Sequence, residues 1–321
     1  MSLRFKTNLL EHAKSVAAWA RANDARAFMD LDGMKLGVRR GSRVIEFAAQ
    51  YVGHRPDGTL GYFSEVGPAC IGFVGWLPYP VQRWDLSTSK LAFKDAMRGA
   101  GVRVPAGWTD LRAVDEAFIV KRDRSAFGYG IRGPFAAAAA RDAGFQLREG
   151  EFAEAFKTSR IARAWYWAGT LAVLEVFEMP CVVGDGTSCV ESLLRRRLGA
   201  DVELPTGTDE VARWQGFDLR RDVPAAGRSL IADFRYVSPF NPTVYANSNR
   251  WAELRETSIG RAFADAGQRV WALIPDAPAQ PKAFVLDAIV DDADRVWLLE
   301  VNSNAQLHPD LYGPMLERLF R

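Results

Sequence analysis

The stretch from Ala283 to Asn304 reads AFVLDAIVDDADRVWLLEVNSN and decides the fold. Two apolar runs, 283–290 and 296–301, flank an Asp-Asp-Ala-Asp segment. Both runs are rich in β-branched and aromatic residues, and the acidic segment between them is typical of a turn. The stretch therefore predicts a β-hairpin.

Three oxygen-bearing side chains interrupt the apolar runs. Asp287 lies midway along the first run, and Glu300 and Asn302 lie two residues apart at the end of the second. Because side chains on a strand alternate between faces, Glu300 and Asn302 share a face, and pairing about the turn brings Asp287 to them. Carboxylate and amide oxygens are typical ligands of Mg²⁺, so one interpretation is a magnesium site. The alternative, a hairpin whose acids face solvent, fits the spacing about equally well.

The chain has 321 residues and a net charge of +2. This length exceeds the usual size of one compact domain, so two or three subdomains are expected. A nearly neutral chain without a long basic run offers no broad electrostatic footprint for nucleic acid or for an acidic membrane. We therefore expect small ligands.

The three cysteines, Cys70, Cys181 and Cys189, show no CxxC spacing and cannot all pair. Their number and spacing favour free thiols in a reducing compartment over a disulfide framework. The N-terminal residues lack the long apolar core of a signal peptide, and no apolar run approaches membrane-spanning length. We therefore expect a cytoplasmic protein.

A helix is predicted over 87–100, with Ser87 or Ser89 as its N-cap. It carries Lys90 and Lys94 one turn apart and ends at a Gly-Val-Arg-Val-Pro segment that begins an extended stretch.

Residues 117–121 are predicted to form a strand that ends in Lys121. The following loop, 122–131, contains Gly128 and Gly130. A lysine that leaves a strand beside a small-residue loop can cradle phosphate, because backbone N–H groups can approach closely while the ammonium supplies charge. Alternatively, the glycines simply turn a hairpin and the lysine lies at the surface.

Residues 151–156 are predicted to form a strand, and 161–167 and 170–177 a hairpin that turns at Ala168-Gly169. Such an apolar segment suits a linker along an adenine ring, and it equally suits plain core strands. After it, residues 182–194 predict a strand, a Gly-Asp-Gly turn and a helix capped by Thr187 or Ser188.

The remaining segments are predicted from apolar periodicity and turn residues alone. Residues 51–62 are expected to form a loop within an N-terminal α/β unit of short buried strands. The other predicted elements are a helix over 8–30, strands over 44–47, 70–74 and 230–237, and helices over 251–266 and 311–320.

The order of these features resembles the ATP-grasp superfamily of carboxylate-amine ligases. A helix lysine, a strand lysine before a glycine loop, a strand linker and a final Asp…Glu-x-Asn follow one another over about residues 87–321. The Gly-Asp-Gly turn and its helix look like those of cyanophycin synthetase and of bifunctional glutathione synthetases. The resemblance implies an α/β (α+β) ATP-grasp fold. Its two α+β subdomains, 87–180 as the nucleotide lid and 181–321 with the metal site, would follow a smaller N-terminal α/β domain, 1–86.

The resemblance also implies roles for individual positions. The nucleotide-binding positions would be Lys94 and Lys121 for the ATP phosphates, the loop with Ser125, Gly128 and Gly130 over them, and Glu154, Ala155 and Phe156 along the adenine. The Mg²⁺ ligands would be Asp287, Glu300 and Asn302, and the catalytic positions Arg163 and Arg235.

Three positions depart from the family pattern. Ile161 stands where family members usually have the acid that holds the ribose hydroxyls, and Ala305 stands where a proline usually follows the final Asn. Val285 occupies the position two residues before the first metal acid, where some members have an arginine, and Arg235 is the nearest upstream substitute.

The implied activity is that of an ATP- and Mg²⁺-dependent ligase. A small-molecule carboxylate, such as an amino acid or peptide, would attack the γ-phosphoryl group, and an amine would trap the acyl phosphate as an amide. No nucleophilic residue is needed, so His308 and the cysteines are interpreted as structural. The alternatives are a kinase on the same scaffold and a non-catalytic nucleotide-binding protein. Neither a nucleic acid nor a membrane partner is expected, and the sequence is compatible with a homo-oligomer.

Overall fold

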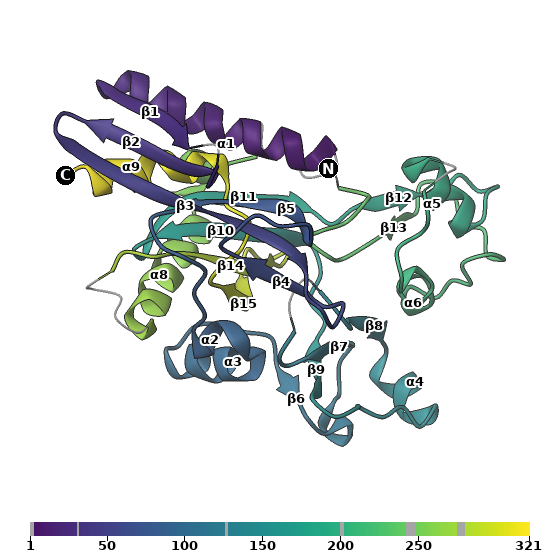
Figure 1. The fold of residues 1–321 in the computed structure, drawn as a ribbon. Coiled ribbons are helices and arrows are strands. Elements are labelled where there is room, and N and C mark those ends of the chain that lie inside the picture. The colour runs from purple at the N-terminus through teal and green to yellow at the C-terminus, as the bar shows by residue number, and fades with distance from the viewer. Residues whose placement is uncertain (1–2, 31, 126–127, 200–201, 242–247, 275–279) are drawn as a thin grey trace.

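The computed structural model describes residues 3–321 apart from 31, 126–127, 200–201, 242–247 and 275–279. Its strands form antiparallel sheets flanked by helices (Figure 1), so the predicted α+β class is confirmed.

The N-terminal part consists of one long helix and one antiparallel sheet, with β5 pairing on β3 beside the path β1-β2-β3-β4. Its elements are α1 (Leu3–Ala22), β1 (Ala25–Asp30), β2 (Lys35–Arg40), β3 (Arg43–His54), β4 (Leu60–Phe63) and β5 (Cys70–Leu77).

Two predictions for this part are wrong. The helix expected over 8–30 ends at Ala22, and burial alternates residue by residue along Ala25–Asp30, as a strand requires. The segment 51–62, expected to be a loop, holds the end of β3 and the start of β4. Alternating burial at the end of β3 keeps Tyr51 and Gly53 in the core, so the strand continues past the expected stop.

The predicted acidic hairpin is confirmed and lies in the sheet β11-β10-β14-β15. These strands are β10 (Arg160–Trp167), β11 (Thr170–Glu178), β14 (Ala283–Val290) and β15 (Val296–Asn302). One face carries small and aliphatic residues such as Ala162, Leu286 and Leu298, which share a core with Phe263 of α8 (Ser258–Leu273). The N-terminal sheet lies on the other side of these strands in Figure 1, so the sheet forms the middle layer.

A third sheet, of order β6-β9-β7-β8, carries the predicted strand lysine. It contains β6 (Gly107–Trp108), β7 (Phe118–Arg122), β8 (Arg132–Phe135) and β9 (Glu151–Ala155), with the helices α2 (Asp85–Thr88), α3 (Lys90–Gly99), η1 (Leu111–Ala113) and α4 (Ala137–Asp142) around it. The predicted cap of α3 is confirmed at Ser89, whose side chain accepts from the N–H of Ala92.

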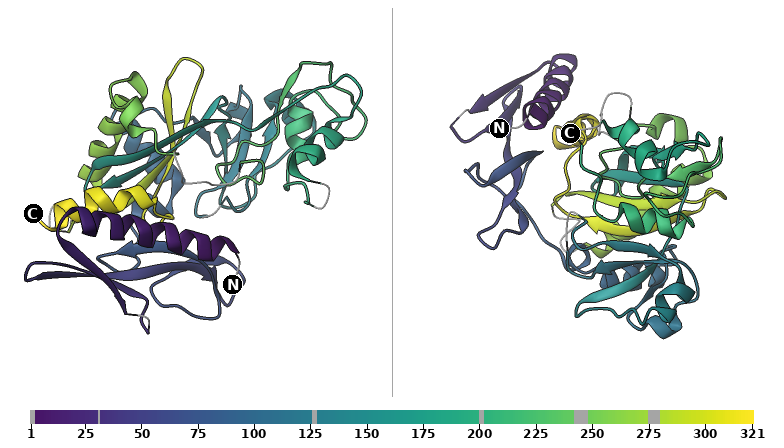
Figure 2. Two further views of the ribbon diagram at one scale, coloured as in Figure 1. Left: turned by 90° about the horizontal axis from the view of Figure 1, so that it is seen from above. Right: turned by 90° about the vertical axis from the view of Figure 1, so that its right-hand side faces the viewer.

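The segment after β11 forms a small separate core that projects from one end of the molecule (Figure 2). Its elements are β12 (Cys181–Val183), α5 (Val190–Leu198), α6 (Thr208–Trp214) and β13 (Ser229–Ile231). The expected cap of α5 at Thr187 or Ser188 is wrong. Both residues donate their backbone N–H to Asp185 instead, and Cys189 takes the N-cap position.

The C-terminal part returns to the N-terminal sheet. It contains α7 (Trp251–Leu254), η2 (Pro309–Leu311) and α9 (Tyr312–Leu319) besides α8 and the hairpin. The helix expected over 251–266 is broken in two, because Thr257 caps a new helix by accepting from Gly260. The strand expected over 230–237 ends at Ile231. Helix α9 lies against α1 in both views of Figure 2, so the first and last helices share one core.

The segment boundaries expected from the resemblance do not all coincide with the sheets. Strands β10 and β11 precede residue 180 in the chain, yet they pair with the acidic hairpin rather than with the sheet of Lys121. The two sheets therefore divide the chain near residue 159. The expected division into 1–86, 87–180 and 181–321 stays a prediction.

Across the described residues, no helix combines the length and apolarity that crossing a membrane requires.

His12 of α1 is enclosed by the core that joins the two ends of the chain. Its Nδ1 lies 2.8 Å from the hydroxyl oxygen of Tyr312, which itself accepts from the N–H of Trp76. Burial, and to a lesser extent His308, lower the pKa of His12 from 6.5 to about 3. His12 is therefore neutral in the folded protein at neutral pH.

The lowered pKa predicts a loss of stability in mild acid. The unfolded chain binds a proton at His12 below pH 6.5 whereas the folded chain does not, so stability falls as pH drops below 6.5. Between pH 7 and pH 5 this one group should remove about 2 kcal/mol. Urea unfolding at both pH values should show the loss in wild type and a smaller loss in His12→Gln. His54→Gln, on an exposed strand end, is the matched control, and an equal loss in His12→Gln would contradict the assignment.

Candidate active site

The hairpin brings Asp287, Glu300 and Asn302 together on one sheet face. Asp287 and Glu300 are direct partners across β14 and β15, and the strand register shifts just beyond Asp287. The Asn302 amide nitrogen lies 2.9 Å from Asp287 Oδ2 and 3.4 Å from Glu300 Oε1. Both carboxylates therefore point toward one small amide group.

Arg163 of β10 completes this cluster. It lies opposite Asp287 in the strand register and donates to both of its oxygens, at 2.5 and 2.9 Å. The Tyr236 ring covers the guanidinium at 3.8 Å. Burial opposes the charge of Arg163, but Asp287, Tyr236 and Glu300 together raise its pKa. The arginine is therefore a permanent cation beside the first predicted metal ligand.

The donor chemistry of this cluster fits Mg²⁺. The carboxylates of Asp287 and Glu300 both point toward the amide group of Asn302, which also carries an oxygen. Mg²⁺ prefers such oxygen ligands. Among the described residues, no group of three or more His, Cys, Asp or Glu side chains is arranged to hold a metal ion, and the hairpin cluster has two carboxylates and one amide. If an ion binds at this cluster, Asp287, Glu300 and Asn302 would supply its protein ligands.

The two predicted phosphate lysines share one buried carboxylate. Lys94 Nζ lies 2.7 Å from Glu154 Oε2, and Lys121 Nζ lies 2.6 Å from Glu154 Oε1. Relative exposures are 0% for Lys94, 5% for Lys121 and 1% for Glu154. Burial lowers the pKa of Lys94 despite the opposing effect of Glu154. Burial would raise the pKa of Glu154, but Lys121 and Lys94 together lower it, so the carboxylate is charged.

The structure places the expected adenine-lining residues in the interior. The carboxylate of Glu154 faces the two lysines. The backbone N–H groups of Ala155 and Phe156 donate to carbonyls of neighbouring segments. The Phe156 ring packs edge-on against Trp214 and Phe234. The side chain of Phe156 therefore contributes packing, and the N–H groups of Ala155 and Phe156 are already hydrogen-bonded within the protein.

The glycine loop begins near the hairpin acids, because Lys90 contacts both Ser125 and Glu300. Gly128 and Gly130 have φ angles of 69° and 76°, which glycine adopts without strain. The Ser125 carbonyl accepts from Lys90 Nζ at 2.5 Å. Residues 126–127 of the loop lie outside the described part of the chain.

Lys90 is a site residue that the sequence prediction missed. Its Nζ lies 3.4 Å from Glu300 Oε2 while it donates to Ser125. The signal was present as the one-turn spacing of Lys90 and Lys94 on a predicted helix, but only Lys94 was assigned a role.

Arg235 lies on another segment. It donates to both oxygens of the buried Asp233, at 2.8 and 3.1 Å, and its side chain keeps 27% of its surface exposed. The structure thus holds Arg235 in place without bonding it to the hairpin acids.

Further polar residues surround the Arg163 cluster. Tyr236 donates to Glu175 at 2.5 Å, and Glu175 lies 3.7 Å from the buried His308. Burial lowers the pKa of His308, which fits its interpretation as a structural histidine. Burial raises the pKa of Tyr62 in β4, on which Arg163 and both hairpin acids act electrostatically. Tyr62 of the N-terminal sheet therefore lies within electrostatic range of the cluster, which no sequence motif indicated.

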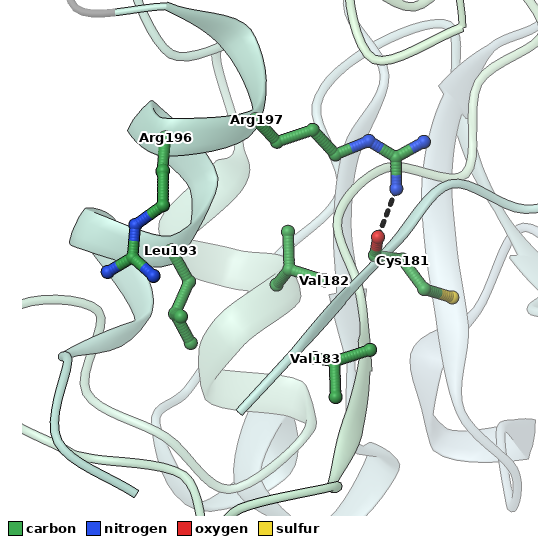
Figure 3. A pocket seen from close by; sticks show the side chains of 6 residues that line it. All are labelled: Cys181, Val182, Val183, Leu193, Arg196 and Arg197. Carbon is green, nitrogen blue, oxygen red and sulfur yellow. Dashed lines mark hydrogen bonds between the residues drawn. The ribbon is translucent and has the colours of Figure 1, made fainter. Parts of the chain in front are cut away.

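An open pocket lies outside this cluster, between β12 and α5 (Figure 3). Arg197 donates to the Cys181 carbonyl at its edge. Its lining residues are Cys181, Val182, Val183, Leu193, Arg196 and Arg197. None of them belongs to the predicted site.

The buried lysine pair predicts that Glu154 is essential for stability. Glu154→Gln leaves two buried ammonium groups without a counter-charge, and breaking a buried ion pair from one side costs about 3–5 kcal/mol. Guanidinium unfolding at pH 7 should show this loss. The matched control is Glu11→Gln, which breaks an exposed pair with Lys14 and should cost less than about 1 kcal/mol. Equal stability of the two variants would contradict the buried triad.

No family model and no curated protein matches the sequence. A bifunctional glutathione synthetase from Pasteurella multocida is similar in structure, at 15% identity, 95% coverage of this chain, 44% of that chain and a TM-score of 0.41. A putative ATP-grasp superfamily protein from Archaeoglobus fulgidus shows 11% identity, 70% and 47% coverage and a TM-score of 0.32.

A D-alanine–D-alanine ligase from Bacillus anthracis, complexed with ATP, shows 13% identity, 72% and 65% coverage and a TM-score of 0.36. The chain spans less than half the length of the first two structures. The similar structures thus include proteins described as ATP-grasp, the superfamily that the motifs resemble. All of these TM-scores lie below 0.5.

Proposed function

We propose that the chain is an ATP- and Mg²⁺-dependent ligase of the ATP-grasp type that joins a carboxylate to an amine. The observation that carries the proposal is the convergence of Asp287, Glu300 and Asn302 beside Arg163 on one sheet face. Acids that face solvent are hydrated by water and do not require contacts such as those with Asn302 and Arg163. This arrangement instead supports a site for a cation and a polyanionic substrate.

Three lysines would supply positive charge to the phosphates. Lys90 of α3 forms an ion pair with Glu300. Lys94 of α3 and Lys121 of β7 both form ion pairs with Glu154. A triphosphate would compete with Glu154 for these two lysines, because the triphosphate and the carboxylate are both anions that accept several hydrogen bonds. The lysines would then orient ATP, which is the role proposed for them together with Ser125, Gly128 and Gly130.

The two arginines would act differently. Arg163 donates two hydrogen bonds to Asp287, so it would fix the orientation of that carboxylate and add positive charge next to it. Arg235 is partly exposed and anchored on Asp233, so its guanidinium would be available to an incoming substrate carboxylate.

The reaction needs positioning and charge rather than a nucleophilic side chain. The substrate carboxylate would attack the γ-phosphoryl group, ADP would leave, and the amine would displace phosphate from the acyl phosphate. When bound, Mg²⁺ would neutralise charge on the transferring phosphoryl group. The chain's residues would hold the reacting groups in line and limit the access of water. A cytoplasmic location, expected from the three free cysteines, is part of the same proposal.

The reaction class predicts that product formation requires an acid and an amine together. Amino acids and short peptides, supplied as both acid and amine, should release ADP and phosphate in equal amounts, measured with coupled assays and mass spectrometry of the product. A stable phosphorylated product formed without any amine would instead identify a kinase. If nucleotide binds and no combination releases ADP, the proposal of an enzyme is wrong.

The metal assignment predicts a separation between activity and folding in Glu300→Gln. The side chain is 28% exposed and forms an ion pair with Lys90 at 3.4 Å, so the loss of its charge should cost about 1 kcal/mol or less. The stabilisation of the protein by Mg²⁺–ATP should largely disappear, and turnover should fall by about 10² or more. Thermal melting with and without ligand, and steady-state kinetics, measure both effects.

Asp292→Asn is the matched control, because Asp292 is an exposed acid in the turn of the same hairpin. It should keep the wild-type response to Mg²⁺ and ATP. Wild-type behaviour of Glu300→Gln in the same assays would rule out the metal site.

A further inference from the structure

Lys90 joins three parts of the candidate site. Its ammonium nitrogen donates to the Ser125 carbonyl at 2.5 Å and to the Ser125 hydroxyl at 3.4 Å. The same nitrogen lies 3.4 Å from Glu300 Oε2, and its side chain is only 11% exposed. One cation therefore links helix α3, the start of the glycine loop and a proposed metal ligand.

The backbone around Lys90 is firmly anchored. Asp123 accepts from the backbone N–H of Leu91 at 2.9 Å and from the Ser89 hydroxyl at 2.8 Å. The N–H of Lys90 itself donates to the Asp123 carbonyl. The first turn of α3 is thus attached to the end of β7, so the position of the ammonium follows from the fold rather than from a flexible surface side chain.

The position of Lys90 conflicts with that of a metal ion on Glu300. The ammonium is already within ion-pair distance of Oε2, and a divalent cation on the same carboxylate would repel it. Lys90 would then have to leave Glu300 or exchange it for another anion. A phosphate group on the metal would be such an anion, because Mg²⁺ commonly binds through carboxylates and substrate phosphates together.

We propose that Lys90 is a positioning residue that makes metal binding at Glu300 dependent on nucleotide. It acts as the counter-cation of Glu300 and so opposes binding of the metal alone. When a triphosphate accompanies the metal, the displaced ammonium gains a phosphate partner and favours the complex. The inference rests on the proposed function and adds to it an order of binding, in which metal enters with nucleotide rather than before it.

The experiment measures the metal alone and the metal–nucleotide complex in the same variants. Mn²⁺, which prefers the same oxygen ligands, is titrated by electron paramagnetic resonance without nucleotide, and Mg²⁺–ATP is titrated by calorimetry. In Lys90→Met, which keeps the aliphatic stem, Mn²⁺ alone should bind about three- to tenfold more tightly. Mg²⁺–ATP should bind at least about tenfold more weakly.

Two further variants separate this effect from a structural role. Lys90→Arg keeps the charge and should restore weak binding of Mn²⁺ alone. Lys14→Met removes an exposed lysine from α1 and should change neither affinity. Melting temperatures near the wild-type value establish that the variants are folded.

The opposite directions of the two changes decide the outcome. If both affinities fall in Lys90→Met, or neither changes, while wild type binds Mg²⁺–ATP, the inference is wrong and the proposed function stands. If wild type binds neither Mn²⁺ nor Mg²⁺–ATP, the proposed function fails and the inference fails with it.

Discussion

The bidentate ion pair between Arg163 and Asp287 is the constraint on which the candidate site depends. It places two full charges on a sheet whose opposite face is packed with aliphatic side chains. Neither charge can be removed alone without leaving the other poorly solvated, so both strands are held in one register. The same pair orients the Asn302 amide, and through it the direction of Glu300. Local order at the site therefore follows from one contact between strands β10 and β14.

The sequence was informative where a local pattern determined the structure. The acidic hairpin, the β10–β11 hairpin and the cap at Ser89 were predicted because alternation, turn residues and capping act over a few positions. The convergence of Asp287 with Glu300 followed from strand pairing alone. The remaining parts of the site depend on contacts between distant segments. The sharing of Glu154 by two lysines arises from tertiary packing, which no spacing rule encodes.

The two lysines of α3 show how one helix can serve two environments. Lys90 and Lys94 are one turn apart, so they project from the same side of the helix. The anchoring of the first turn on Asp123 directs Lys90 toward the hairpin acids, whereas Lys94 enters the buried interior of the adjoining sheet. A change in the tilt of this helix would move both ammonium groups at once. The position of α3 therefore links the phosphate side of the site to the metal side.

The contact between α1 and α9 has a consequence for the way this protein is made. His12 and Tyr312, which meet in that core, are separated by 300 positions in the sequence. On the ribosome, the N-terminal sheet emerges long before the residues that cover its apolar side, such as Tyr312, Met315 and Leu316. Contacts of such long range form late, and the uncovered surface is prone to association in the meantime. Synthesis of the nascent chain thus includes a long interval in which an apolar surface of this N-terminal sheet is not yet covered by the C-terminal residues that pack on it.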